Sequence, residues 1–218
     1  MTSMKPKNTL KDKMYHAIFT SIIKGEYQPE TIITEKILVE KYSMSKSPIR
    51  EALIELCNEG VLRSIPRYGY EVIRITEYDI QEIQNYRIIL ECGSLNTYWH
   101  LINPTTISKL LDIKTCQLEY DVLEHWKRNT DFHLELVACY GNRFLYKSLL
   151  DALRFQARAY AQFYWNHWQR TSFVSKQQKH KNLLEAIQSG DKKLAIHYLE
   201  ADINEFAQGE EFFQPIFL

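Results

Sequence analysis

The amino-acid sequence predicts a mainly α-helical protein of two domains, the first of which carries a short β-hairpin. Seven Gly and six Pro in 218 residues are few, and this favours long helices over a turn-rich β fold. Apolar residues recur at helical spacing through most of the chain. The exception is residues 61–73, where two extended runs flank a turn that contains glycine.

Composition limits the class of protein. The 27 Lys and Arg residues balance 27 Asp and Glu, but bases outnumber acids in residues 1–75 and acids outnumber bases in residues 76–218. This distribution fits a nucleic-acid-binding front half. The sequence has no run of about 18 apolar residues that could span a membrane, and its polar, basic start does not resemble a signal peptide. The four cysteines have no paired spacing, as is typical of reduced thiols, so we expect a cytoplasmic protein without a membrane partner.

The N-terminal sequence predicts two helices before Lys46. Asn8 or Thr9 can cap the first helix, which Gly25 ends. The segment 26–33 contains a proline and is expected to be an irregular or short extended link. A second helix is expected over residues 35–42, after a threonine that can cap it.

A third helix should follow a tight turn and end near Gly60. Ser47 is expected as its N-cap, with Pro48 at the first helical position. The apolar residues behind this start form one buried stripe, so Lys46, Ser47 and Arg50 gather at an exposed helix start. Free N–H groups and the positive end of the helix dipole make such a start suitable for phosphates and base edges.

The extended runs 61–65 and 70–73 predict a hairpin directly after the third helix. Two helices joined by a tight turn are the helix-turn-helix arrangement, and a basic hairpin after it is a wing. Such a wing can rest Arg67 on the DNA backbone or in the minor groove. A plain helical hairpin is the alternative for the helical pattern alone, but the wing and the cations favour nucleic-acid binding. We place this winged helix-turn-helix domain at residues 1–75.

The second domain, residues 76–218, is predicted to be an all-α bundle of about six helices. Capping residues, Pro and Gly mark the expected ends of its helices, and apolar periodicity marks their lengths. Helices are expected near residues 76–102, 105–120, 121–140, 143–169, 173–189 and 191–208.

Several of these helices carry a polar or charged residue on an apolar stripe. A turn at Gly190 would bring His180 and Asp202 level, each about 16 Å from the turn. The same reasoning, about a turn at Gly141-Asn142, places Arg154 level with Asn129 and Thr130. The alternatives from the residues alone are a metal site, a buried polar ligand pocket, or hydrogen-bonded core residues; a mixed nitrogen and oxygen set suits Zn, Ni or Mn. The inward residues are Arg87, Asn129, His133, His180 and Asp202.

Residues 10–75, with the core SKSPIREAL and the wing RYG, resemble the winged-helix domain of the GntR family of bacterial transcription regulators. Lys46 stands where most relatives have Arg, so a point charge replaces a bidentate fork and the base preference is expected to differ. The resemblance implies contacts to double-stranded operator DNA from Lys36, Ser45, Lys46, Ser47, Arg50, Arg67, Tyr68 and Gly69.

Residues 76 to about 208 resemble the all-helical effector domain, of FCD type, of the FadR branch of that family. The segments YRIILE, NTDFHLELVACYGN and KHKNLLEAIQSGDKKLA carry this resemblance. It implies a divalent metal that helps to hold a small carboxylate effector, although some members lack the metal and bind fatty-acyl ligands. Asn129 replaces the usual Asp, and Asp202 replaces the usual last His. The implied metal ligands are Asn129, His133, His180 and Asp202, and the implied effector-binding residues are Arg87 and Arg154.

The resemblance therefore implies a repressor that binds a palindromic operator as a homodimer and responds to an effector by a shift between two populations of dimer. The effector domain is expected to form most of the dimer contact. One alternative is a metal-dependent helical-bundle enzyme with an accessory DNA-binding domain. We expect no enzymatic activity, because no inward carboxylate is placed as a general base. The other alternative is a repressor whose pocket is vestigial.

Overall fold

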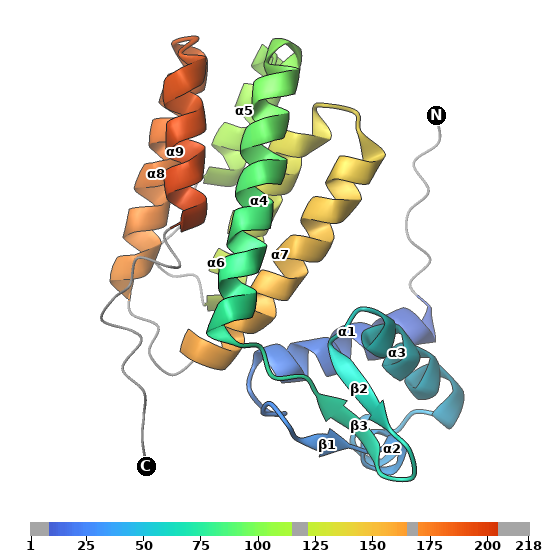
Figure 1. Ribbon diagram of the computed structural model, residues 1–218. Coiled ribbons are helices and arrows are strands. Elements are labelled where there is room, and N and C mark those ends of the chain that lie inside the picture. The colour runs from blue at the N-terminus through green and yellow to red at the C-terminus, as the bar shows by residue number, and fades with distance from the viewer. Residues whose placement is uncertain (1–8, 115–121, 165–169, 205–218) are drawn as a thin grey trace. The chain divides into compact units, whose positions relative to one another are not determined.

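The computed structural model describes residues 9–114, 122–164 and 170–204 (Figure 1). The chain divides into two compact units. The first unit runs to Thr76 and also takes in the end of helix α7 (Arg143–Tyr164) from Arg158 onward, and the second unit contains the other helices. The expected helical stretches at 115–121, 165–169 and 205–208 lie outside the described residues.

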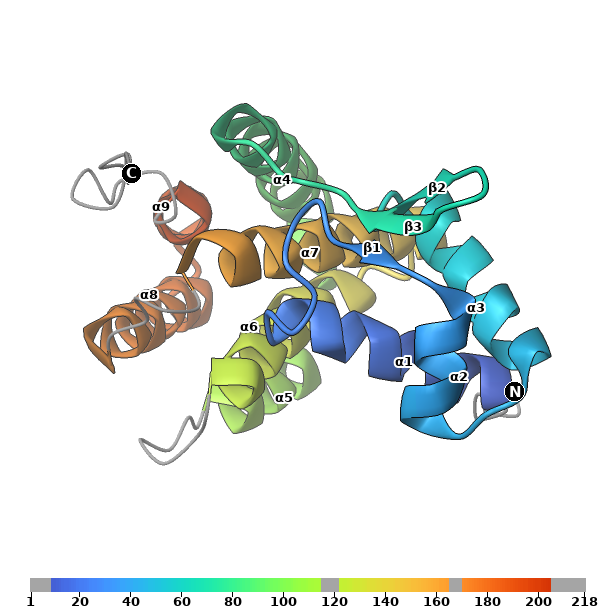
Figure 2. The same cartoon turned by 90° about the horizontal axis from the view of Figure 1, so that it is seen from below.

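Besides the end of α7, the first unit contains three helices and a small antiparallel sheet with strand order β1-β3-β2, seen from below in Figure 2. The hairpin of β2 and β3 is the predicted wing. Strand β1 falls in the segment expected to be a short link, and it pairs Ile32 with Glu71 and Ile33 with Tyr70. Two residues are too few to show a strand period in the sequence. The elements are α1 (Leu10–Ile23), β1 (Ile32–Ile33), α2 (Glu35–Tyr42), α3 (Lys46–Asn58), β2 (Leu62–Ile65) and β3 (Gly69–Val72).

The ends of the first two helices follow from local chemistry. Thr9 caps α1 in a capping box: the Asp12 N–H donates to Thr9 Oγ1 over 3.1 Å, and the Thr9 N–H donates to Asp12 Oδ2 over 3.0 Å. Gly25 follows α1 with φ +72°, the left-handed conformation that favours glycine. Thr34 caps α2. These bounds match the sequence prediction.

The start of α3 corrects the prediction. Ser45, not Ser47, is the N-cap, and the helix begins at Lys46. Pro48 is consequently the third helical residue, which costs no hydrogen bond because the first turn of a helix has no acceptors for its N–H groups. Ser47 instead donates from Oγ to Glu51 Oε1 over 2.8 Å.

The core of the first unit forms where α3 packs on α1 and on the sheet. Ile49, Leu53 and Leu56 on α3 are fully buried, as is Ile18 on α1. Because this apolar stripe faces inward, the opposite face of α3 is exposed. The buried members of the core are Met14, Tyr15, Ile18, Ile22, Ile33, Leu38, Ile49, Ala52, Leu53, Leu56, Val61, Leu62 and Val72.

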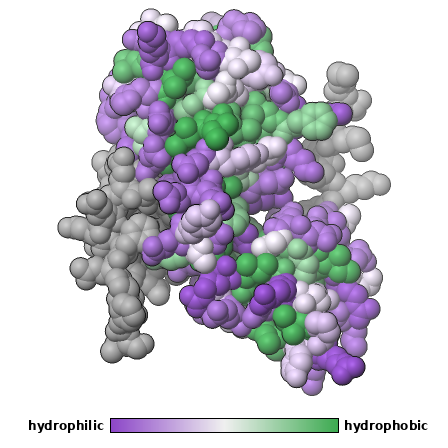
Figure 3. Space-filling view, in the orientation of Figure 1, coloured by the Kyte–Doolittle hydropathy of each residue, from purple (hydrophilic) through white to green (hydrophobic). Residues whose placement is uncertain are grey.

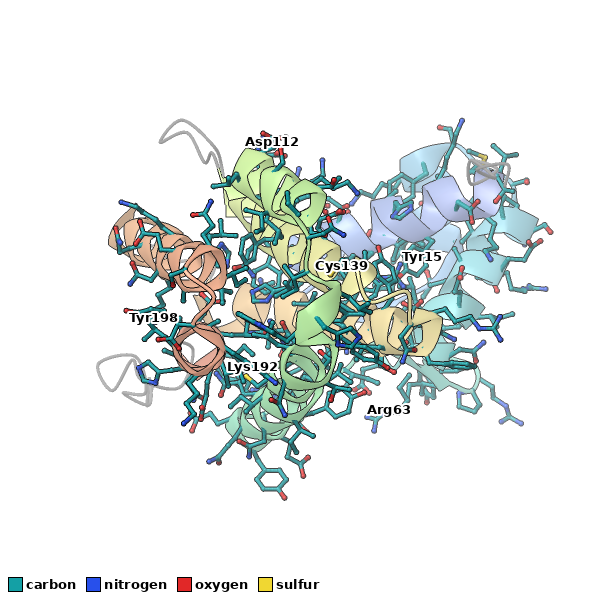
Figure 4. All side chains as sticks on the ribbon, turned by 90° about the horizontal axis from the view of Figure 1, so that it is seen from above. Tyr15, Arg63, Asp112, Cys139, Lys192 and Tyr198 are labelled. Atoms are coloured by element: carbon teal, nitrogen blue, oxygen red, sulfur yellow. The ribbon has the colours of Figure 1, made fainter. Side chains whose placement is uncertain are left out.

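The regular elements of the second unit, within its described residues, are all helices and form the predicted bundle. Figure 4 shows side chains filling the space between its helices. Helices α8 and α9 form a hairpin that turns at Gly190, where φ is +77°. No helix in the described part of the chain combines the length and the apolar character that a membrane span requires. The elements are α4 (Glu77–Tyr98), a 3₁₀ turn (Trp99–Leu101), α5 (Pro104–Lys114), α6 (Val122–Ala138), α7, α8 (Arg170–Gln188) and α9 (Lys192–Asn204).

The wing depends on Gly69. Its φ is +140°, and a Cβ there would lie 2.5 Å from the carbonyl oxygen of Ile33 on β1. A side chain at this position would therefore oppose the pairing of β1 with β3. Gly69 has a structural role whether or not it touches DNA.

We expect Gly69→Ala to lower the free energy of unfolding of the first unit by about 3 kcal/mol, because φ +140° is a region that only glycine occupies readily and the new methyl group meets backbone. Urea denaturation would measure this loss. Gly60→Ala is the control: φ is +64° there and nothing lies within 4 Å of the added Cβ, so its cost should be about 1 kcal/mol. Equal losses in the two variants would contradict the predicted clash with Ile33.

Candidate functional site

The first unit presents the predicted DNA-binding residues on its surface. Lys46, Ser47 and Arg50 are exposed at the start of α3, because the stripe on the other side of this helix is buried. In the turn of the wing, Arg67 has φ +70° and Tyr68 is 70% exposed. Of the eight predicted residues, Lys36, Ser45, Lys46, Ser47, Arg50, Arg67 and Tyr68 are exposed and Gly69 is half-buried.

Arg50 is held by a carboxylate that the sequence analysis did not single out. Its Nε donates to Glu35 Oε1 over 2.7 Å and its Nη2 donates to Glu35 Oε2 over 2.9 Å. The guanidinium lowers the pKa of Glu35, which therefore stays ionised. Arg50 is thus an oriented cation on the exposed face of α3.

The second unit contains a buried polar cluster, defined here as Arg87, Glu91, His133, Gln156, His180 and Asp202. Arg87 on α4 is 2% exposed. Its Nε donates to Glu91 Oε1 over 2.7 Å, one turn along the same helix, and its Nη1 donates to Gln156 Oε1 on α7. Its Nη2 is buried without a hydrogen-bond partner.

The buried polar cluster continues from Glu91 to α6, α8 and α9. Glu91 Oε2 lies 2.7 Å from Nδ1 of His133, and Nε2 of His133 lies 3.0 Å from Asp202 Oδ2. His180 Nε2 lies 3.4 Å from the same Asp202 oxygen. The ring of His180 stacks on Phe132, with centroids 3.9 Å apart. Five helices, α4 and α6 to α9, thus bring the functional groups of this cluster into one chain of contacts.

The charges of the buried polar cluster explain its pKa values. Burial alone would raise the pKa of Glu91, but Arg87 and His133 outweigh it and lower that pKa. Burial would likewise raise the pKa of Asp202, yet the two histidines hold it well below its usual value. The pKa of His133 is raised: burial opposes its charged form, but the Glu91 carboxylate and Asp202 favour it. The cluster holds one guanidinium and two buried carboxylates, so a further positive charge stabilises it.

The donor set fits a divalent cation. One ligand atom from each of His133, His180 and Asp202 lies within 4.8 Å of the others, and all three residues are buried. Ligand atoms about 2.1 Å from one ion lie about 3.0–3.4 Å apart at ordinary coordination angles, which matches the two separations at Asp202. Asn129, one turn before His133, is buried, and its Oδ1 and Asp202 Oδ1 have no hydrogen-bond partner. Buried oxygens without hydrogen-bond partners are suitable metal ligands, and the Asp202 carboxylate lies beside both imidazoles.

The structure brings most of the predicted residues of the second unit together. Arg87, His133, His180 and Asp202 are in one network, and Asn129 is buried on the inward stripe of α6. Arg154 is half-buried, whereas Gln156 is the α7 residue that contacts Arg87.

Two members of the buried polar cluster, Glu91 and Gln156, were not predicted from the sequence. Glu91 stands four residues after Arg87 on an inward stripe, and this spacing of opposite charges was a usable signal. Gln156 is the neighbour of Leu153 and Leu149 on a buried face of α7, where a polar residue also indicates a hydrogen-bond partner.

A winged helix-turn-helix joined to a helical unit with a buried polar site defines a class of two-domain transcription regulators. Residues 10–72 match the family described as bacterial regulatory proteins, gntR family, and residues 82–205 match the FCD domain. The chain belongs to the GntR family, in the branch that carries an FCD domain, and it is a transcription regulator.

Individual relatives agree with this assignment. A regulator from an unstable DNA locus of Streptomyces ambofaciens is 24% identical over 184 residues, which are 84% of this chain and 77% of that protein. The gluconate operon transcriptional repressor of Bacillus licheniformis is 33% identical over 57% of this chain, and the match spans about half of that relative, 52%. The solved structure of Escherichia coli McbR/YncC has the same fold, with a TM-score of 0.77, 18% identity and coverage of 91% of this chain and 95% of that one.

We expect Glu91→Gln to lower the free energy of unfolding of the second unit by about 3 kcal/mol, because it leaves Arg87 as an uncompensated buried charge. Urea denaturation of the wild type and the variant, both treated with a chelator, would measure this loss. The control is Glu135→Gln, which breaks the partly exposed 2.8 Å pair with Lys109 and should cost less than about 1 kcal/mol. A Glu91 variant no less stable than this control would show that Arg87 does not depend on Glu91.

Proposed function

We propose that this regulator is a repressor that binds a palindromic operator as a homodimer and is controlled by a small carboxylate effector. Two observations support the proposal. The proposed DNA-binding domain, residues 1–75, exposes an oriented cationic helix start and a basic wing. The second unit buries unpartnered polar atoms of Arg87, Asn129 and Asp202 in one bundle, a composition that suits a small polar ligand.

On DNA, the start of α3 would enter the major groove and the wing would lie along the backbone. Arg50 is the residue of α3 with a planar fork that can pair with two acceptors of one guanine. Lys46 would contribute a point charge toward a phosphate or a single acceptor. Lys36 and Arg67 lie on the exposed surfaces of α2 and the wing, where phosphate contacts would set the register.

A second copy of the chain would place two α3 helices about 34 Å apart on a palindrome. The surface of α4 supports a dimer contact in the second unit. Tyr78, Tyr86 and Ile89 lie on one stripe of this helix and are exposed, Ile89 by 75%. Green residues interrupt the purple surface of this unit in the space-filling view (Figure 3). Apolar side chains clustered on one helix face are typical of a surface that another protein covers.

The effector is proposed to be a small carboxylate. The Nη2 group of Arg87 is a buried donor without a partner, so an anionic oxygen would satisfy it. Glu91 already neutralises much of the charge on Arg87, so a carboxylate would need further positive charge nearby. A divalent metal such as Zn, Ni or Mn, held by His133, His180, Asp202 and Asn129, would supply that charge. Relatives named for a gluconate operon make gluconate the first acid to test.

The route from effector to DNA is proposed to run through α7. This helix carries Gln156, which contacts Arg87 in the second unit, and from Arg158 onward it belongs to the first unit. An effector that repositions Arg87 would change the partner of Gln156. Preference of the effector for one arrangement would then shift the population of dimers that bind DNA.

We expect the purified protein to retain about one divalent ion per chain and Asp202→Ala to lose it, because the variant removes the carboxylate that faces both histidines. Asn129→Asp should bind the ion more tightly, because it places a charge where Asn129 has an unpartnered oxygen. Elemental analysis and native mass spectrometry would report both, together with the number of subunits. His197→Ala, at an exposed histidine of α9, is the control and should keep the ion. Unchanged metal content in Asp202→Ala would refute this site.

We expect the wild type to bind a duplex selected from a random-sequence pool, and gluconate or a related small acid to change that affinity by about 5-fold or more. Arg87→Lys keeps a cation beside Glu91 but loses the free fork, so it should bind the duplex normally and respond weakly to the acid. Fluorescence anisotropy would measure both. If no acid changes the affinity of the metal-loaded wild type for the duplex, the result would favour a repressor with a vestigial pocket. Turnover of an acid would favour the enzyme.

A further inference from the structure

Glu35 is the first residue of α2, directly after the cap residue Thr34. Its side chain is only 20% exposed. The carboxylate accepts two hydrogen bonds from Arg50. Burial and the nearby Glu35 charge raise the pKa of Tyr70 on strand β3 of the wing. A single carboxylate therefore joins α2 to the exposed face of α3, close to the wing.

We propose that Glu35 is a positioning residue for sequence recognition: it holds the Arg50 guanidinium in the orientation that reads a base. This inference rests on the proposed function, because it assumes that α3 reads DNA. Glu35 does not touch the DNA itself. It acts through Arg50, so the specificity of the protein depends on a residue outside its recognition helix.

The number of N–H groups that Arg50 keeps available supports this role. A guanidinium carries five N–H groups. Glu35 uses the Nε–H and one N–H of Nη2. Of the three that remain, one N–H of Nη1 and one N–H of Nη2 lie side by side on the outer edge of the fork. That edge can donate to the O6 and N7 atoms of one guanine. A long side chain fixed before binding also loses less conformational entropy when the complex forms.

Helix α3 has one arginine that can make a bidentate contact to a base. Arg50 is the sole Arg between Lys46 and Asn58, and the other cation at the start of the helix is the lysine Lys46, which has no bidentate fork. Accurate placement of Arg50 therefore matters more than it would beside a second arginine. Two other arginines of the first unit, Arg63 and Arg74, pair with Glu71 and Glu30, but neither lies on α3.

Two hypotheses predict opposite outcomes for removal of the Glu35 charge. If Glu35–Arg50 is an ordinary surface ion pair, its carboxylate only repels phosphates, and Glu35→Gln should tighten binding to every duplex. If Glu35 positions Arg50, the same variant should weaken binding to the selected duplex while binding to unrelated DNA stays equal or tightens. The ratio of the two affinities separates the hypotheses.

The experiment uses the full chain and two duplexes of equal length, one selected by the wild type from a random pool and one unrelated, at one fixed salt concentration. We expect Glu35→Gln to lower the ratio of selected to unrelated affinity by about 10-fold, in the range of one bidentate base contact. Glu40→Gln is the matched control, because it removes an exposed carboxylate from the same helix, one that pairs with Lys36 instead of Arg50. Its ratio should not change.

Two further variants keep the outcome interpretable. In Arg50→Ala, the additional change Glu35→Gln should lower the ratio no further, since Glu35 acts through Arg50. Tyr70→Phe removes the hydroxyl that lies near the Glu35 charge and should lower the ratio in the same direction, even if Glu35→Gln fails to fold. Equal ratios for the Glu35 and Glu40 variants, with normal folding, would overturn the proposal. A wild type that selects no duplex would instead refute the proposed function.

Discussion

The balance of charge inside the helical bundle is the constraint on which the second unit depends. Arg87 and two carboxylates lie where water cannot solvate them, so each must find a partner within the fold. Glu91 serves both Arg87 and His133, and Asp202 faces both histidines. One guanidinium does not neutralise two carboxylates. The bundle is therefore built around a site that gains stability from added positive charge, whether a proton on histidine or a bound cation.

The same view bears on the two positions at which the family resemblance leads us to expect other ligands. With Asn129 where an acid is expected and Asp202 where a histidine is expected, the negative charge lies on α9 instead of α6. The carboxylate now faces His133 and His180 directly, while the amide oxygen of Asn129 is buried without a hydrogen-bond partner. A compensated exchange of this kind preserves the attraction for a cation.

Two arginine–glutamate pairs serve different ends in the two units. Arg87 and Glu91 are almost inaccessible, and their removal costs stability because a buried charge is left behind. Arg50 is largely exposed and Glu35 is not, so this pair adds little to stability but orients a side chain. The difference lies in solvent access. A buried pair acts on the fold, whereas an exposed pair on a recognition surface acts on whatever binds there.

The helical class, the wing, the bounds of α1 and α2, and the inward positions of Arg87, His133, His180 and Asp202 were predictable, since they follow from periodicity, caps and turns that act over a few residues. What depends on distant segments was not predictable: strand β1, whose two residues become a strand only by pairing with β3, and the partners of each charge. Glu91, Gln156 and Glu35 acquire their roles only because packing brings another helix to them. Local sequence specifies which face a side chain occupies, whereas the group it meets there is set by the packing of helices far apart in the chain.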